Sequence, residues 1–179
     1  MKKLLLILLF LPMIGFGQSN NKSWLGDGLG EYFETNGNPK SKGLEFKIKI
    51  PLGYESNGEG KKEETVQLFK SSSGILLMLQ VVNLANDPRY FQFLELSEED
   101  RKRKVKNNLV SSSEAIYCEI KDYPSAITNL WLKDKKISHL STFTIVKEYR
   151  LSITFMSNYI LGENDMEFCK EMLNTIEFY

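Results

Sequence analysis

Four strand-like segments with very short connections follow one another in the second half of this chain, and they limit its fold more than any other feature. The segments span about residues 115–121, 126–133, 137–146 and 149–157. Asp134-Lys135 lies at one connection and Lys147-Glu148 at another. Parallel strands need a long crossover, so connections this short indicate antiparallel hairpins. The region therefore predicts an antiparallel sheet.

Three further strands are predicted before these four. Residues 46–50 alternate between large apolar and charged side chains, which indicates a strand with one buried face that ends at Pro51. Residues 66–69 predict a second, short strand. Residues 75–84 are apolar on both faces, a pattern typical of a central strand that is covered twice.

Two helices complete the predicted fold. Ser97 is a good N-cap for a helix that carries acids in its first turn and runs to about Ser111. The last helix begins at Gly162 and has an apolar stripe, made of Met166, Cys169, Leu173 and Ile176. These elements predict an α+β fold, an α/β/α sandwich with a central, mainly antiparallel sheet of about six to seven strands. The two helices are expected on opposite faces of that sheet.

The first 17 residues have the pattern of a secretory signal peptide. A basic head at Lys2 and Lys3 precedes a leucine-rich run, and small residues lie at Gly15 and Gly17. The run is too short for a membrane-spanning helix. We expect cleavage between Gly17 and Gln18 and export to the periplasm or the medium. The first cysteine lies far downstream, so no lipid anchor and no stable membrane attachment are expected after cleavage.

The mature chain has the size of one ordinary domain. Removing 17 of the 179 residues leaves 162. Residues 18–43 are rich in Gly, Asn, Ser and Lys and are expected to form a flexible N-terminal segment, followed by a single domain over residues 44–179. Trp24 in that segment is either an anchor onto the domain or a contact for a partner.

Charge and histidine content narrow the possible chemistry. The full chain has 23 basic and 23 acidic residues, and loss of Lys2 and Lys3 leaves 21 against 23, a formal charge of −2. Nucleic-acid binding needs a basic domain, so no nucleic-acid partner is expected. A single histidine, His139, leaves little scope for metal or acid–base chemistry near neutral pH. No cofactor is expected.

The segments at the two ends of the predicted domain resemble PsbP-like domains. Residues 46–54, FKIKIPLGY, are similar to the opening strand and Pro-x-Gly-aromatic turn of that family, and residues 172–178, MLNTIEF, to its closing helix and tail. The resemblance covers residues 44–179, about three quarters of the chain. It implies an α/β/α sandwich and an accessory binding role. Members include extrinsic photosystem subunits, a Ran GTPase-binding protein, bacterial envelope lipoproteins and secretion-effector chaperones. No family site is carried over, because no binding motif matches residue by residue.

Candidate catalytic and metal-binding residues have ordinary structural explanations. His139 lies beside Ser138 and Ser141, but no nucleophile elbow accompanies it, so we interpret it as a strand histidine. Glu163, Asp165 and Glu167 could bind calcium, yet acids in the first turn of a helix are favoured by its dipole and the spacing of a calcium loop is absent. We therefore predict no catalytic and no metal-binding residues.

The two cysteines leave an alternative open. Cys118 lies on an apolar strand face and Cys169 on the apolar stripe of the last helix. In an oxidising compartment they could form a disulfide. Two separate buried thiols fit their apolar surroundings equally well.

The basic run Arg101–Lys104 is interpreted as a solvated helix face. Acids at residues 98–100 each precede a base by four residues, so the run carries its own counter-charges. A binding surface is expected instead at the loops around Tyr54 and Tyr123.

Three classes of function follow from these observations. The favoured one is an exported, non-catalytic accessory or binding module of the cell envelope with a protein or small-ligand partner. The alternatives are a secreted inhibitor or immunity-type protein and an unrecognised envelope hydrolase. The sequence does not identify the binding residues.

Overall fold

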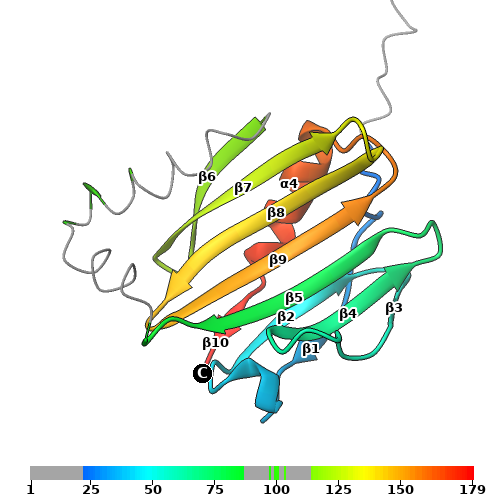
Figure 1. Cartoon of the computed structure of the whole chain (residues 1–179). Coiled ribbons are helices and arrows are strands. Elements are labelled where there is room, and N and C mark those ends of the chain that lie inside the picture. Colours follow the sequence, from blue (N-terminus) through cyan, green and yellow to red (C-terminus); the bar gives the residue numbers. More distant parts are fainter. Residues whose placement is uncertain (1–21, 87–96, 98, 101–102, 104–113) are drawn as a thin grey trace, which may run out of the picture.

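A seven-stranded antiparallel sheet is the main structural element of the chain (Figure 1). The computed structural model describes residues 22–86, 97, 99–100, 103 and 114–179. The strand order is β3-β4-β5-β9-β8-β7-β6. The bounds are β3 Tyr54–Ser56, β4 Thr65–Ser71, β5 Leu76–Asn83, β6 Glu114–Ile120, β7 Tyr123–Leu132, β8 Ile137–Val146 and β9 Tyr149–Ser157. The predicted α+β sandwich with an antiparallel sheet is confirmed.

Strands β6 to β9 form a meander, as the short connections predicted. Val146 pairs with Tyr149 across a two-residue turn, and Ile120 pairs with Tyr123 across another. Both residues of the second turn, Lys121 and Asp122, have positive φ angles of 48° and 70°. Positive φ at both central residues is typical of the type I′ turns that match the twist of antiparallel strands.

A second, three-stranded sheet has the order β1-β2-β10. It contains β1 Leu29–Glu34, β2 Phe46–Pro51 and β10 Glu177–Phe178, with a 3-10 turn, η2 Pro39–Ser41, between the first two. Two expectations are corrected. Residues 29–34 were predicted to be flexible, but they form β1 and pair with β2. The strand predicted at residues 46–50 was expected in the main sheet, but it forms β2 of the three-stranded sheet, where its neighbours are β1 and β10.

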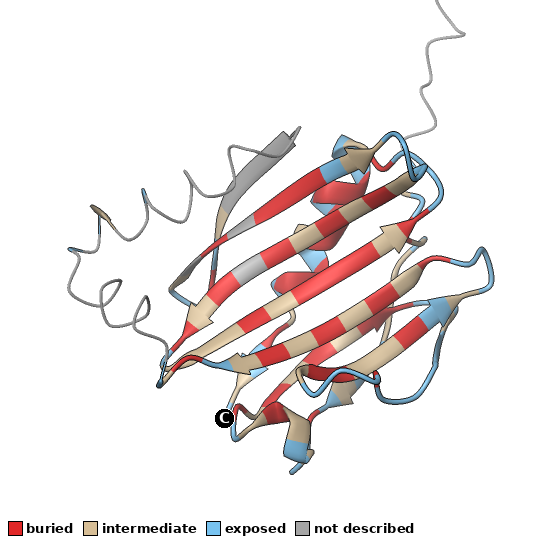
Figure 2. Cartoon of the chain, viewed as in Figure 1, coloured by how far each residue is buried: buried red, intermediate tan, exposed pale blue. Residues whose placement is uncertain are grey.

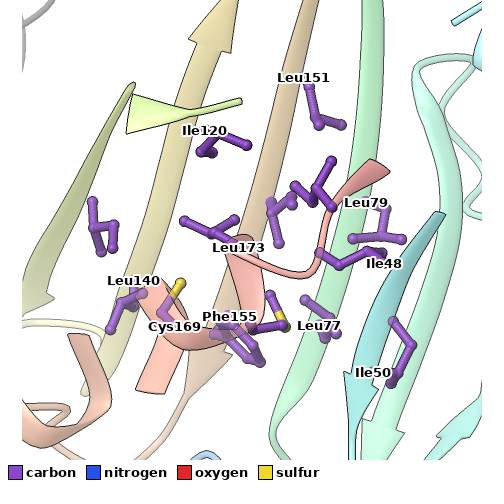
Figure 3. Packing of buried hydrophobic residues seen from close by; sticks show 14 of the residues in the cluster. Ile48, Ile50, Leu77, Leu79, Ile120, Leu140, Leu151, Phe155, Cys169 and Leu173 are labelled. Carbon is purple, nitrogen blue, oxygen red and sulfur yellow. The ribbon is translucent and has the colours of Figure 1, made fainter. Parts of the chain in front are cut away.

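The helix α4, Glu163–Leu173, and the small sheet pack on the same face of the main sheet (Figure 1). Figure 3 shows Cys169 and Leu173 of α4 pointing toward Leu140 and Phe155 of the sheet. All four side chains are fully buried. Each large apolar side chain buried in this way contributes about 1.5–3 kcal/mol, so the core fixes α4 and β2 against the main sheet.

Strand β5 is buried on one face and half-buried on the other (Figure 2). Leu77, Leu79 and Val81 have no exposed surface, whereas Leu76 and Met78 keep part of theirs. The helix predicted over residues 97–111, expected on that second face, lies outside the described residues except for four of them. Within these, Ser97 Oγ accepts a hydrogen bond from the amide of Asp100 at 3.2 Å, the N-cap contact expected from the sequence.

Candidate functional site

Three loops meet at one end of the sandwich and form a cleft of about 760 Å³. The N-terminal turn contributes residues 22–27, the turn after β2 contributes residues 52–54, and the turn after β4 contributes residues 71–73. Gly53, with φ 78°, makes the sharp turn that brings Tyr54 under the cleft. The volume lies within the roughly 300–1,000 Å³ typical of small-ligand sites.

A buried carboxylate holds the N-terminal turn in place. Asp165 Oδ1, on the first turn of α4, accepts hydrogen bonds from Ser23 Oγ at 2.8 Å, the Trp24 amide at 2.6 Å and the Leu25 amide at 3.3 Å. Its Oδ2 accepts one from the Gly162 amide at 2.8 Å. Asp165 is 2% exposed, so these bonds form in surroundings that make them strong. Asp165, which the sequence analysis considered as a calcium ligand, therefore anchors the main chain of the N-terminal turn. Among the described residues, no group of three metal-binding side chains occurs.

The indole ring of Trp24 forms one wall of the cleft. It stacks on the ring of Tyr159 with centroids 4.7 Å apart and planes 2° from parallel. Tyr159 does not line the cleft, and the Trp24 side chain is still 57% exposed. The main chain of Trp24 is therefore anchored to α4, the first of the two roles considered from the sequence, and its ring is held in place with much of its surface free.

Tyr54 lies in the lining of the cleft and has a buried hydroxyl. Its ring packs edge-on against Phe155, with centroids 6.2 Å apart. Its Oη has no hydrogen-bond partner among the described residues. Burial raises the pKa of Tyr54 well above its usual range, and the nearby Ser71 hydroxyl offsets this only in part. The phenol thus stays protonated, and its hydroxyl is enclosed by the protein.

The polar and charged side chains of the lining are electrically balanced. Ser71 Oγ and Ser73 Oγ are hydrogen-bonded at 2.8 Å, and Ser71 Oγ also accepts from the Ile75 amide at 3.0 Å. Lys22 and Asp27, the charged residues of the lining, form an ion pair at 2.9 Å. The lining carries no net formal charge.

His139 lies away from the cleft. It is on β8, and the register places Lys70, Leu76, Met156 and His139 in one row across four strands. Three strand spacings separate His139 from Lys70 and the adjoining serine turn by roughly 14 Å. Burial and the charge of Lys135 lower the pKa of His139. In the described chain, His139 is therefore not a base for the serines of the cleft.

The two loops expected to form a binding surface lie apart. Tyr54 lines the cleft beyond the end of β2, whereas Tyr123 packs edge-on against Phe178, with centroids 5.7 Å apart. Phe178 pairs with Phe46 at the start of β2, so Tyr123 lies toward the opposite end of the sandwich.

Both cysteines are free thiols in this structure. Cys169 is fully buried in the core, and Cys118 packs against that core from β6. Burial raises the pKa of both thiols, most strongly for Cys169. Cys169 is therefore an inert thiol of the apolar interior, and neither cysteine has the lowered pKa of an activated nucleophile.

The basic run is described only at Arg103. Its side chain is 74% exposed and pairs with Asp100 at 2.7 Å, three residues earlier in the helix instead of the predicted four. Arg101, Lys102 and Lys104 lie outside the described residues, as do the signal region and its cleavage point between Gly17 and Gln18. No helix in the described ranges is long and apolar enough to cross a membrane.

The sequence analysis singled out Tyr54 and Trp24, but it did not predict which residues contact them in the cleft. Asp165 and Tyr159 are more than 130 residues from Trp24 in the chain, and no local pattern links them. The run Ser71-Ser72-Ser73 was interpreted only as a turn. Its place beside Tyr54 follows from the pairing of Tyr54 with Ser71.

Comparison with known proteins shows similarity in fold only. No protein-family model matches this chain, and no curated protein matches its sequence. The solution structure of cyanobacterial PsbP (CyanoP) from Synechocystis is similar, with a TM-score of 0.46 and 10% identity over 86% of this chain and 96% of that one. A crystal structure from Bacteroides thetaiotaomicron has a TM-score of 0.47 and 13% identity over 75% of this chain and 45% of that one.

Proposed function

We propose that this chain is an exported, non-catalytic binding module of the cell envelope and that it binds its ligand or partner in the cleft walled by Trp24. The observation that carries the proposal is that the exposed indole ring of Trp24 is held in one position by two other residues. Asp165 fixes its main chain and Tyr159 fixes its ring. A large aromatic side chain held rigidly at a concave surface loses little entropy on binding, which is how binding anchors gain affinity.

A binding role fits the cleft better than a catalytic one. The hydroxyls of Ser71 and Ser73 bond to each other, and the histidine lies on a different part of the sheet. Within the described residues, the cleft has no nucleophile paired with a base. Export is supported by the basic head, leucine-rich run and small residues that precede Gln18.

Two measurements test this proposal. Mass spectrometry of the native protein from cell fractions should find an N-terminus at Gln18 outside the cytoplasm, and an intact Met1 would contradict export. The protein starting at Gln18 should retain an envelope component on a column, Trp24→Ala should lose it, and Tyr179→Ala should keep it. Tyr179 is a suitable control because it is 66% exposed and follows β10, far from the cleft. Retention by Trp24→Ala, or by none of the three, would contradict the proposal.

A further inference from the structure

We propose that the end of the sandwich that carries Trp24 is a membrane-contact surface, which rests reversibly on a lipid bilayer containing anionic headgroups. The exposed apolar side chains of this end enter the headgroup region, and neighbouring lysines contact the lipid phosphates. The inference goes beyond the proposed function, because a bilayer contact at this end does not depend on what the cleft binds.

Four large apolar side chains are exposed together at this end. Seven such side chains are exposed among the described residues, and four of them, between 39% and 66% exposed, form a set that we call the apolar tips: Trp24, Leu52, Tyr159 and Ile160. Trp24 stacks on Tyr159, and Leu52 lines the same cleft as Trp24. Ile160 follows Tyr159 directly in the chain. A group of exposed apolar side chains of this kind marks an interaction surface.

The apolar tips lie on connections between elements and not on the face of a sheet. Leu52 lies in the turn between β2 and β3, and Tyr159 and Ile160 lie in the connection from β9 to α4. Trp and Tyr combine an apolar ring with a polar atom, so they are enriched where a bilayer meets water. Leu and Ile add the apolar area that drives binding to such an interface. The composition of the apolar tips therefore fits a lipid surface.

A basic turn lies beside the apolar tips. Residues 133–136, KDKK, join β7 to β8, and all four are exposed (Figure 1). Ser138, just after this turn, pairs with Ser157 at the end of β9. Ser138 Oγ also accepts a hydrogen bond from the Leu161 amide at 3.3 Å. These contacts fix the basic turn next to the connection that carries two of the apolar tips.

The charge of this end suits an anionic lipid surface. The basic turn has three lysines and one aspartate, a formal charge of +2 (3 − 1). Lys22 and Asp27 form an ion pair at 2.9 Å and cancel each other, and Glu163, which begins α4, lowers the excess to +1. The attraction to anionic headgroups is therefore weak and sensitive to salt, and apolar contact contributes most of the affinity.

The expected export signal joins the molecule at this same end. Residues 1–21 lie outside the described residues, and Lys22, where the described chain starts, is part of the cleft lining. The stretch from Gly17 to Lys22 spans at most about 18 Å when fully extended. An inserted signal would thus hold this end close to the bilayer. This placement favours a lipid surface over a second copy or a protein partner as the occupant.

Co-sedimentation with lipid vesicles tests the proposal. The chain starting at Gln18 keeps every described residue. We expect it to sediment with vesicles of phosphatidylcholine mixed with phosphatidylglycerol, and more weakly with phosphatidylcholine alone. In Trp131→Phe, Trp24 is the only tryptophan. Its emission should shift to shorter wavelength with the mixed vesicles and should be quenched when brominated lipids are included.

An apolar tip outside the cleft lining provides the decisive variant. Ile160→Ser should weaken vesicle binding about three- to tenfold, because it removes apolar area from the contact. Tyr179→Ser is the matched control, since Tyr179 is also 66% exposed but follows β10 at the opposite end of the sandwich. It should bind vesicles like the parent. Equal binding by Ile160→Ser and the parent would overturn the proposal.

A pair of lysines tests the role of the basic turn. Replacing Lys135 and Lys136 with Gln should weaken binding to the mixed vesicles and leave binding to phosphatidylcholine unchanged. Lys61 and Lys62, also exposed and adjacent, precede β4 at its other end, so their replacement with Gln is the control. Equal binding to the mixed vesicles by the two double variants would overturn the role given to the turn.

The outcomes separate this inference from the proposed function. Ile160→Ser should still retain the envelope component on the column, because Ile160 does not line the cleft. If no vesicle binds the parent while column retention depends on Trp24, the membrane contact is wrong and the binding function stands. A dimer that forms without lipid and that Ile160→Ser dissociates would make the apolar tips an interface between two copies and would also overturn the membrane contact.

Discussion

The main-chain amide of Trp24 donates a hydrogen bond of 2.6 Å to the carboxylate of Asp165, a residue 141 positions later in the chain. The contact joins the first described turn of the molecule to the beginning of α4. It also sets the position of the indole ring, because the backbone of Trp24 cannot shift while its amide is held. The stability of the N-terminal turn and the shape of the cleft therefore depend on the same side chain.

Replacing Asp165 with Asn should loosen the N-terminal turn. An amide group has only one acceptor oxygen, so donors now shared between Oδ1 and Oδ2 would lose a partner. We expect the free energy of unfolding to fall by about 1.5–3 kcal/mol, the range for hydrogen bonds to a charged group. Urea unfolding measures this, and Glu167→Gln, on an exposed position of the same helix, is the control. An unchanged midpoint in Asp165→Asn would show that the carboxylate does not hold the turn.

Gly60 should not tolerate a side chain. A Cβ at this position would overlap the side chain of Thr65, which is itself buried. We expect Gly60→Ala to destabilise the protein by about 1–3 kcal/mol, as overpacking does. Gly28→Ala is the matched control, since a Cβ there would make an ordinary contact of 3.4 Å with Leu52. Thermal unfolding of the two variants should differ clearly, and equal melting temperatures would contradict the packing described for this loop.

Glu45 should make stability fall in acid. Its carboxylate accepts hydrogen bonds from Thr35 Oγ1 at 2.6 Å, the Gly37 amide at 3.2 Å and Ser41 Oγ at 3.2 Å. These bonds, that of Thr35 first, lower the pKa of Glu45 below its ordinary value of 4.5. The unfolded state then binds the proton more readily than the folded state, so this contribution to stability is present above pH 4.5 and is lost as the pH falls below it.

Urea unfolding between pH 6 and pH 3 measures this contribution, because Glu45→Gln removes the titrating group. We expect the stability of the parent to decline more steeply below about pH 4.5 than that of Glu45→Gln. Glu31→Gln, at an exposed position on β1, is the control. Parallel pH profiles for the parent and Glu45→Gln would contradict the prediction.

The two thiols should differ in reactivity. Cys169 is fully buried and Cys118 half-buried, and burial raises the pKa of each. Because the thiolate is the reactive form, iodoacetamide should modify Cys118 slowly and Cys169 only after unfolding. Mass spectrometry of timed samples, with and without urea, follows both sites. Rapid labelling of Cys169 in native protein would contradict its burial, and an intact mass lower by two hydrogens would show a disulfide instead of the free thiols described.

The sequence was most informative where structure depends on local pattern. Strands β8 and β9 have the predicted bounds because the alternation from Tyr149 to Phe155 and the polar turn Lys147-Glu148 are visible within a few residues. Strand β1 was missed because Gly30 weakens its pattern, and it becomes a strand only by pairing with β2. The same reason limits prediction of the site. Trp24 and Tyr54 were noticed as aromatic residues in loops, but the contacts that define the cleft join positions far apart in the chain.

Strand β10 places a condition on when this molecule can finish folding. Phe178 pairs with Phe46 and Glu177 with Lys47, so residues 177–178 complete a sheet that begins more than 130 residues earlier. The meander from β6 to β9 has near neighbours in sequence and can form early, whereas the sheet of β1, β2 and β10 depends on a contact between distant residues and closes later. A chain emerging from the ribosome therefore leaves one edge of β2 without its partner strand until residues 177–178 have emerged.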